Sequence, residues 1–386
     1  MTILAPPKLD DIDLQVIELI DEQKARLRHY VHNNPQRWDG ALRRNTMARA
    51  IQGSNTIEGY DATIDDAIAA VDAEEPMDTD AETWREIVGY RNAMTYILQL
   101  AEDEHFEFHP QLIRSLHFMM LQHDLRKMPG RWRPGEIFVV NELTEERVYT
   151  GPDFALVPKL VGELVDFLNE ASDVPIMVKA AMAHLNLTMI HPFKDGNGRM
   201  ARALQTLVLS REGIVSPIFS SIEEWLGRNT PAYFEILAAT GQGSWHPEND
   251  PHNWIVFCLT AHFQQAYTIV KRNEWYARIY NDIEKIQEKA KLPERAYSAL
   301  MDGALGLRVR AGRYRGEHDI SDVVASRDLR KMADADLLVP HGERRGRYYT
   351  GSKTLLEIAA KHKTSAKAGD PYEMVRLKNA PELPFQ

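Results

Sequence analysis

Apolar residues recur at helical spacing along most of this chain, whereas the alternation typical of strands is confined to short segments. An acidic stretch of small residues, 69–82, predicts a surface connection after the first helices. The expected fold class is therefore mainly α. The pattern predicts helices over residues 12–32, 41–58, 83–104, 109–124, 155–170, 176–190, 199–211, 231–240 and 252–290.

One internal region departs from helical spacing. The run from Glu136 to Val140 is β-branched and aromatic, turn-forming residues flank it, and residues 147–149 offer a return strand. We therefore expect a β-hairpin within residues 131–150.

The C-terminal part predicts a separate small domain. Pro293 interrupts the long preceding helix, so the domain should occupy about 291–360. Residues 319–335 predict a short helix, a turn near 324–326 and a second helix, followed by a strand, a basic turn and another strand. The last residues, 361–386, predict an irregular tail.

Composition sets further bounds. The 386 residues carry a net charge of −10 and one cysteine, Cys258, which excludes an internal disulfide. The acidic balance argues against indiscriminate nucleic-acid binding. No apolar stretch reaches membrane-spanning length, and the acidic, proline-containing start is unlike a signal peptide. We therefore expect no membrane association and a cytoplasmic location.

The segment HPFKDGNGRMAR, which begins at His191, gathers the chemistry of a phosphate site. Its glycine-rich triplet 196–198 lies where a helix should begin, and the free N–H groups and dipole of a helix start attract anions. Arg199 and Arg202 share the first turn, where they can bind phosphate oxygens. His191 is the candidate general base, and Asp195 is the loop carboxylate that can hold Mg²⁺.

This segment resembles the signature of the Fic family, His-x-Phe-x-Asp/Glu-Gly-Asn-Gly-Arg-x-x-Arg, at every specified position over 191–202. The resemblance implies a helical core over 106–290 that transfers AMP from ATP to a Ser, Thr or Tyr hydroxyl of a target protein, with Mg²⁺ or Mn²⁺ as cofactor. The pair Gly198-Arg199, where the phosphoryl-transferring branch has Lys-Arg, favours AMP transfer. The implied roles are base for His191, metal ligand for Asp195, anion hole for Gly196, Asn197 and Gly198, and phosphate binding for Arg199 and Arg202.

A second motif, SNTIEG, runs from Ser54 to Gly59 within the expected N-terminal region 1–105. It resembles the family's inhibitory helix motif, Ser/Thr-x-x-x-Glu-Gly/Asn. The resemblance implies that Glu58 pairs with Arg202 and blocks the γ-phosphate position, so that the enzyme is auto-inhibited. In some relatives this glutamate also positions a water for removing AMP, which makes deAMPylation a further expectation. The alternative is a surface glutamate near a helix end closed by Gly59.

The predicted hairpin resembles the flap that Fic proteins lay over the active site, the alternative being a purely structural hairpin. An exposed flap edge lets a target segment add as an extended strand. The resemblance implies nucleotide and target contacts for Ile137, Phe138 and Val139, and a place near the adenine for Tyr233. The asparagine that often follows in the family is not evident, since Gly241 stands close to its position. Self-modification and homo-oligomers are further expectations.

The predicted C-terminal domain is similar to the winged-helix modules appended to bacterial Fic proteins. Its slightly basic composition leaves open DNA binding and protein binding or dimerisation. Two functional classes therefore compete: an auto-inhibited protein adenylyltransferase, and a DNA-associated regulator whose core senses nucleotide. The expected DNA contacts are Ser326, Arg327, Arg330 and Lys331 on the second helix, and Arg344, Arg345 and Arg347 in the wing.

Overall fold

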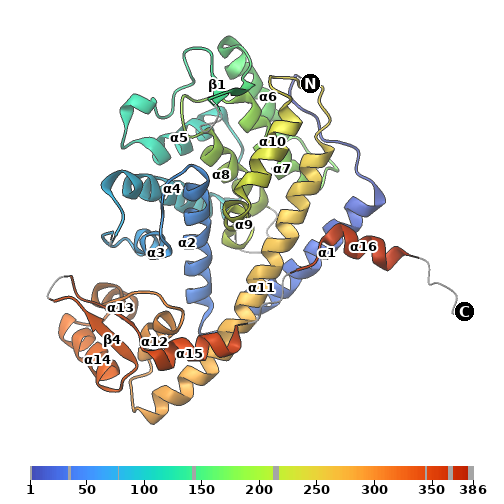
Figure 1. Cartoon of the computed structure of the whole chain (residues 1–386). Coiled ribbons are helices and arrows are strands. Elements are labelled where there is room, and N and C mark those ends of the chain that lie inside the picture. Colours follow the sequence, from blue (N-terminus) through green and yellow to red (C-terminus); the bar gives the residue numbers. More distant parts are fainter. Residues whose placement is uncertain are drawn as a thin grey trace, which may run out of the picture.

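The fold is helical over most of its length (Figure 1). Strands are confined to two small antiparallel sheets, so the predicted mainly α class is confirmed. Within the part of the chain that the structure describes, no helix is long and apolar enough to cross a membrane. The computed structural model describes residues 2–33, 36–76, 78–140, 145–211, 217–343, 346–363 and 368–380.

Most helices up to residue 290 follow the predicted ranges, but α3 and α9 fall where no helix was predicted. The N-terminal ones are α1 (Asp11–Arg28), α2 (Asp39–Ile57), α3 (Ile64–Val71), α4 (Ala81–Leu100) and α5 (Pro110–Leu121). The central ones are α6 (Val157–Asn169), α7 (Ile176–Ile190), α8 (Asn197–Ser210), α9 (Glu223–Arg228), α10 (Thr230–Gly241) and α11 (His252–Lys289). Single turns of 3-10 or π geometry lie at His29–Asn33, Leu125–Lys127, Phe154–Leu156 and Pro217–Phe219.

Helices α7 and α8 form the centre of the molecule. Nearly every side chain of α7 is buried, which explains why its sequence is apolar without a polar face. Helix α8 packs along α7, and α4, α5, α6 and α11 pack against this pair. Helix α11 continues from the core to the C-terminal domain (Figure 1). The short loop between α7 and α8 is therefore held from several sides.

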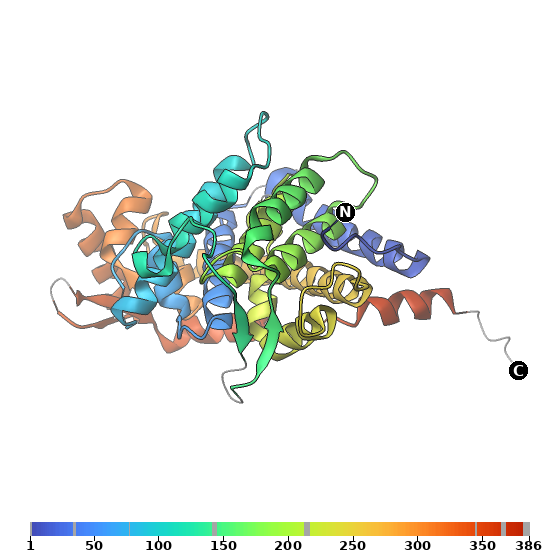
Figure 2. The same cartoon turned by 90° about the horizontal axis from the view of Figure 1, so that it is seen from above.

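The predicted hairpin is present, and Figure 2 shows it projecting from the helical body. Strand β1 (Phe138–Val140) pairs antiparallel with β2 (Arg147–Thr150), with Val139 opposite Tyr149. The hairpin is fastened to the core at its base. The backbone N–H of Thr150 donates to the carbonyl of Gly243 at 3.0 Å, and the Tyr149 hydroxyl donates to the carbonyl of Met189 at 2.8 Å. The predicted turn at 141–142 lies outside the described residues.

The C-terminal domain joins helices to a three-stranded sheet of order β3-β5-β4. The predicted turn near 324–326 is wrong, because these residues lie inside α14. Asp319 ends α13 with a φ of +48°, and the Ser321 hydroxyl accepts the backbone N–H of Val324 as the N-cap of α14. The elements are α12 (Ala296–Ala304), β3 (Val309–Arg310), α13 (Ala311–His318), α14 (Asp322–Asp334), β4 (Leu338–His341) and β5 (Tyr348–Gly351).

Two predictions of irregular structure are wrong in part. Helices α15 (Lys353–His362) and α16 (Pro371–Asn379) occupy part of the predicted tail. Helix α16 packs on α1, where Tyr372 is buried and its hydroxyl donates to Asp13 at 2.9 Å. The start of the predicted surface connection, Ala69, is likewise buried in α3. Tertiary packing thus orders segments whose polar sequence gives little helical signal.

The C-terminal domain contacts the segment that carries SNTIEG. Arg44 of α2 forms ion pairs with Asp302 of α12 and with Asp72 directly after α3. Arg313 of α13 pairs with the same two carboxylates, at 3.1 Å from Asp72. Charges on both sides therefore join this domain to the α2–α3 segment.

Candidate active site

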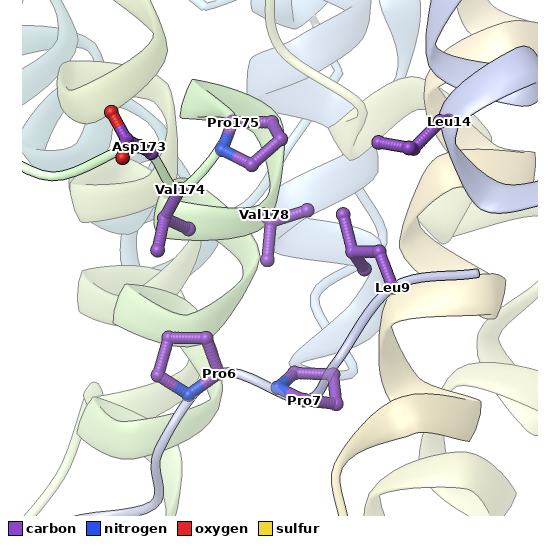
Figure 3. Close-up of a pocket in the computed structure, with 8 residues that line it drawn as sticks. All are labelled: Pro6, Pro7, Leu9, Leu14, Asp173, Val174, Pro175 and Val178. Atoms are coloured by element: carbon purple, nitrogen blue, oxygen red, sulfur yellow. The ribbon is translucent and has the colours of Figure 1, made fainter. Parts of the chain in front are cut away.

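A cavity of about 350 Å³ lies away from the predicted chemistry (Figure 3). Pro6, Pro7 and Leu9 line it from the N-terminal segment, and Pro175 and Val178 line it from the start of α7. His191 follows the opposite end of α7, roughly 20 Å away at 1.5 Å per helical residue. This cavity is therefore separate from the predicted site, which lies at the loop 191–202.

Backbone geometry and one side chain fix the loop between α7 and α8. His191 ends α7 with a φ of +50°, and Gly196 caps α8 with a φ of +72°. The Asn197 side chain accepts the N–H of Phe193 at 2.8 Å and donates to its carbonyl at 2.9 Å. Phe193 is fully buried and stacks on His117, with ring centroids 3.7 Å apart. The loop is thus held rigidly before any ligand binds.

The hydrogen bonding of His191 suits a general base. Its Nδ1 lies 3.2 Å from the carbonyl of Thr188, and a carbonyl accepts only from a protonated nitrogen. Nε2 is then the nitrogen that carries the free electron pair. Loss of surrounding water, with the nearby charge of Arg133, lowers the pKa of His191 to about 4. The imidazole is therefore neutral at physiological pH.

Glu58 occupies the anion site at the start of α8. Its Oε1 accepts from Nη2 of Arg202 at 2.7 Å, and Nε of Arg202 donates to the Ser54 hydroxyl at 2.9 Å. Nη2 also donates to the Ser54 carbonyl at 3.0 Å. A Cβ at Gly198 would come within 2.6 Å of Glu58 Oε1, so the carboxylate lies directly over the first turn of α8. The buried Arg202 has its pKa raised, since the attraction of Glu58 outweighs desolvation.

Arg199 points to a different carboxylate, Glu86 of α4. Glu86 is completely buried and also receives Lys127 Nζ at 2.6 Å and the Tyr60 hydroxyl at 3.0 Å. Nε2 of His123 lies 3.1 Å from it. Burial alone would raise the pKa of Glu86, but Arg199 and Lys127 more than offset this and hold it at about 2. In this structure Arg199 thus donates to Glu86, while its Nη2 lies 4.0 Å from Asp195 of the loop.

Asp195 is placed to hold a metal ion beside the anion site. Its carboxylate is partly exposed, accepts the N–H of Gly196 at 2.5 Å and lies 3.0 Å from Lys127 Nζ. Among the described residues, no three His, Cys, Asp or Glu side chains form a metal-binding group. A single exposed carboxylate fits Mg²⁺, which takes its remaining ligands from phosphates and water. The metal role of Asp195 stays a prediction.

The candidate flap residues are accessible. Phe138 is exposed, whereas Ile137 and Val139 are partly buried. The guanidinium of Arg147 stacks 3.4 Å from the ring centroid of Phe138. Their contacts with nucleotide or target stay predictions.

Tyr233 differs from the expectation of an adenine contact. It is 1% exposed, its hydroxyl lies 2.9 Å from His184 Nε2, and the charge of Arg202 acts on it. The tyrosine therefore packs behind Arg202 and offers no open face to a base. Gly241, close to the position of the family's asparagine, packs against Met189 and Tyr149.

Several residues of the site carried little signal in the sequence. Glu86 looks no different from the exposed Glu82 on the same helix. His117 joins two segments, because Nδ1 accepts the N–H of Gly130 at 2.8 Å and Nε2 donates to the Asp195 carbonyl at 2.9 Å. Arg133 lies within the predicted hairpin range 131–150, and nothing else in the sequence singles it out.

The matches to known proteins agree with this geometry. Residues 107–209 match the Fic/DOC family, a range that contains the hairpin and the whole loop 191–202. A Fic family protein from Desulfovibrio desulfuricans G20 has a similar structure, with a TM-score of 0.57 and 19% identity over 90% of this chain and 98% of that chain. Fic-1 from C. elegans gives a TM-score of 0.53 and 21% identity over 68% of this chain and 73% of that chain. These matches support the Fic fold and the Fic family.

Curated relatives carry the name protein adenylyltransferase. Fic-1 of Caenorhabditis briggsae is 26% identical over 56% of this chain and 41% of its own length. Fic of Nematostella vectensis is 27% identical over 63% of this chain and 54% of its own length. The chain thus spans about half the length of these relatives.

Proposed function

We propose that this chain transfers AMP from ATP to a hydroxyl side chain of a target protein, and that the present structure is its inhibited state. The placement of Glu58 carries the proposal. Its carboxylate pairs with Arg202 and lies over Gly198, at the helix start where phosphate oxygens would bind. The names of the curated relatives support the same reaction.

The loop residues divide the chemistry between them. Nε2 of His191 accepts the proton of the target hydroxyl while the hydroxyl oxygen attacks the α-phosphorus and the bond to pyrophosphate breaks. The N–H groups at the start of α8 and Arg202 stabilise the charge that develops on the phosphate oxygens. Mg²⁺ held by Asp195 would neutralise charge on the departing pyrophosphate. Positioning and charge stabilisation supply most of the catalysis.

Inhibition follows from competition between Glu58 and the nucleotide for the guanidinium of Arg202. The guanidinium of Arg202 binds the Glu58 carboxylate through Nη2, the group expected to hold the γ-phosphate. Ser54 holds the same guanidinium from its other side. When Glu58 leaves, Arg202 remains in place and its free donors face the nucleotide.

Transfer of labelled AMP tests the proposal. We would incubate wild type, Glu58→Gly and the double variant Glu58→Gly with His191→Ala with ATP labelled at the α-phosphate and with lysate. Glu58→Gly should label itself and other proteins, and the double variant should label neither. Asp61→Asn, an exposed change three residues away, is the matched control. Equal labelling by wild type and Glu58→Gly would show that Glu58 is not inhibitory.

The position of the label separates the reaction types. With ATP labelled at the γ-phosphate, Glu58→Gly should transfer no label, because the γ-phosphate leaves in pyrophosphate. Label from the γ-position would identify phosphoryl transfer. AMP removal is the further activity proposed for this site, and it predicts that wild type, with Glu58 intact, releases AMP from the product of Glu58→Gly.

A second candidate function, DNA binding, belongs to the C-terminal domain. Helix α14 exposes Ser326, Arg327, Arg330 and Lys331 on its free face. Arg347 is also exposed, and the predicted wing residues Arg344 and Arg345 lie outside the described residues. These charges favour phosphate contacts. Binding of the full chain to random-sequence duplex DNA, lost in Arg327→Ala with Arg330→Ala, would support it, and equal binding by both chains would reject it.

A further inference from the structure

Arg133 joins the base of the hairpin to the catalytic loop through carbonyl groups. The side chain is 4% exposed. Its Nε donates to the carbonyl of His191 at 2.9 Å, its Nη1 to the carbonyl of Gly135 at 2.6 Å, and its Nη2 to the carbonyl of Pro152. Its own backbone N–H donates to the carbonyl of Pro192 at 2.9 Å. One residue thus binds the segments at both ends of the hairpin and the carbonyls of His191 and Pro192 in the loop.

This arrangement is unusual for a buried cation. Among the described residues, no carboxylate lies within ion-pair distance of Arg133, and the charges of Asp153 and Glu136 act on it only from farther away. Burial of a charge without a close partner is costly. Packing alone would be served by an apolar side chain of similar size. The planar guanidinium instead supplies donors in fixed directions, which a lysine does not reproduce.

The opposite strand approaches the same point. Gly151 follows β2, and its N–H donates to the carbonyl of Ile137 at 3.2 Å. A Cβ there would come within 2.9 Å of Ile137 Cγ2, 3.3 Å of Arg133 Nη2 and 3.8 Å of His191 Cβ. An added methyl group would therefore crowd the Ile137 side chain and the Arg133 guanidinium, at the point where the hairpin passes His191.

We propose that Arg133 is a positioning residue that sets the hairpin, and with it a hydroxyl bound along the hairpin, at the correct distance from His191. The inference rests on the proposed transfer reaction. Arg133 touches backbone carbonyls only, so it acts through the hairpin and through the main chain of His191. Its charge also acts on the imidazole, which gives a measurable signature separate from catalysis.

Substitutions in the active Glu58→Gly background test the proposal. Arg133→Gln removes the positive charge and the planar guanidinium. Arg133→Lys keeps the charge but loses the guanidinium. Both should reduce AMP self-labelling about 100-fold, the loss expected when reacting groups shift by about 1 Å. The affinity for magnesium-bound ATP should fall far less than the labelling, because Arg133 bonds to no residue at the start of α8 and only the predicted nucleotide contacts of the hairpin would change. Arg131→Gln, an exposed arginine of the same segment, is the matched control and should label normally.

NMR titration of ¹³C-labelled histidines separates positioning from general destabilisation. The pKa of His191 should rise in Arg133→Gln and stay at the wild-type value in Arg133→Lys, since only the first change removes the positive charge. A structural role alone would not split the two variants in this way. The proposal is overturned if either variant labels as well as Arg131→Gln, or if its ATP affinity falls as much as its labelling.

Gly151→Ala provides a test that leaves Arg133 intact. The added methyl group should shift the hairpin relative to Arg133 and reduce labelling more than ATP affinity. Unchanged labelling would contradict the proposal even if the Arg133 variants failed to fold. Failure of the proposed function is distinguishable, because Glu58→Gly would then label nothing. The titration of His191, and hydrogen exchange at Thr150 and Gly151, would still report the link between the hairpin and the loop.

Discussion

The two arginines in the first two turns of α8 have carboxylate partners in different surroundings. Arg199 pairs with Glu86, which is completely buried on α4 and also binds Lys127 and Tyr60. Arg202 pairs with Glu58, whose side chain is 23% exposed and stands where α2 ends. The first pair lies in the core, and the second lies at the end of α2, where solvent reaches the carboxylate.

The difference explains how one pair can open without unfolding the site. Glu86 cannot leave without stranding buried Arg199 and Lys127. Glu58 can leave because solvent reaches it and because Ser54 still holds Arg202 through Nε and Nη2. A permanent pair and a releasable pair thus lie one helical turn apart.

The largest expected effect is on stability. Glu86→Gln should lower the free energy of unfolding by about 3–5 kcal/mol, the cost of breaking a buried ion pair by removing one partner. Glu58→Gln should lower it by less than about 1 kcal/mol. Urea denaturation followed by circular dichroism measures both, and equal losses would abolish the distinction between the pairs.

The pH dependence of the unfolding free energy should also reveal the buried Glu86 pair. The pKa of Glu86 is about 2 in the folded chain against an ordinary 4.5, so its pairing stabilises above pH 4.5 and is lost as the pH falls towards 2. The difference in unfolding free energy between wild type and Glu86→Gln should therefore stay constant from pH 7 to 5 and shrink by roughly 3 kcal/mol between pH 4.5 and 2. Urea titrations across this range measure it, and a difference independent of pH would contradict the assigned ion pair.

Release of Glu58 should strengthen nucleotide binding. A hydrogen bond to a charged group contributes about 1.5–3 kcal/mol, so Glu58→Gly should bind magnesium-bound ATP roughly 10- to 100-fold more tightly than wild type. Isothermal titration calorimetry measures the change, with Asp61→Asn as the control. Equal affinities would mean that Glu58 and the nucleotide do not compete.

The smallest expected effect concerns the residue that holds Arg202 from behind. Ser54→Ala removes one acceptor from Nε of Arg202 and keeps the backbone carbonyl, so the loss should be about 1 kcal/mol. In the Glu58→Gly background this corresponds to roughly fivefold weaker ATP binding by calorimetry. A loss as large as that of Arg202→Ala would give Ser54 a larger part in the site.

The sequence could predict those parts of the site that lie close together along the chain. The loop from His191 to Arg202 and the motif ending at Glu58 are contiguous, so their residue types and spacing indicate their geometry. The sequence did not predict the roles of Glu86 and Arg133 in the site, because each contacts residues 191–202 across more than fifty residues of sequence. Such contacts depend on how helices pack, and periodicity does not specify that.

The errors in the fold have similar causes. The turn expected near 324–326 lies in fact at 319–321, because Ser321 caps α14 and Asp319 adopts a left-handed conformation. Helix α16 was missed because its stability comes from packing on α1, where Tyr372 meets Asp13. Local sequence carried little of that information.

The bare surface of Gly198 has a consequence for how this chain can change. The Glu58 carboxylate lies directly above that glycine, and under the proposed function the phosphates of a nucleotide would compete for the same small volume. A side chain at position 198 would exclude both the Glu58 carboxylate and the phosphates. The proposed enzyme would then lose its inhibition and its activity together. Under the proposed function, a substitution of Glu58 would therefore give a constitutively active enzyme, whereas a substitution of Gly198 would give an inactive one.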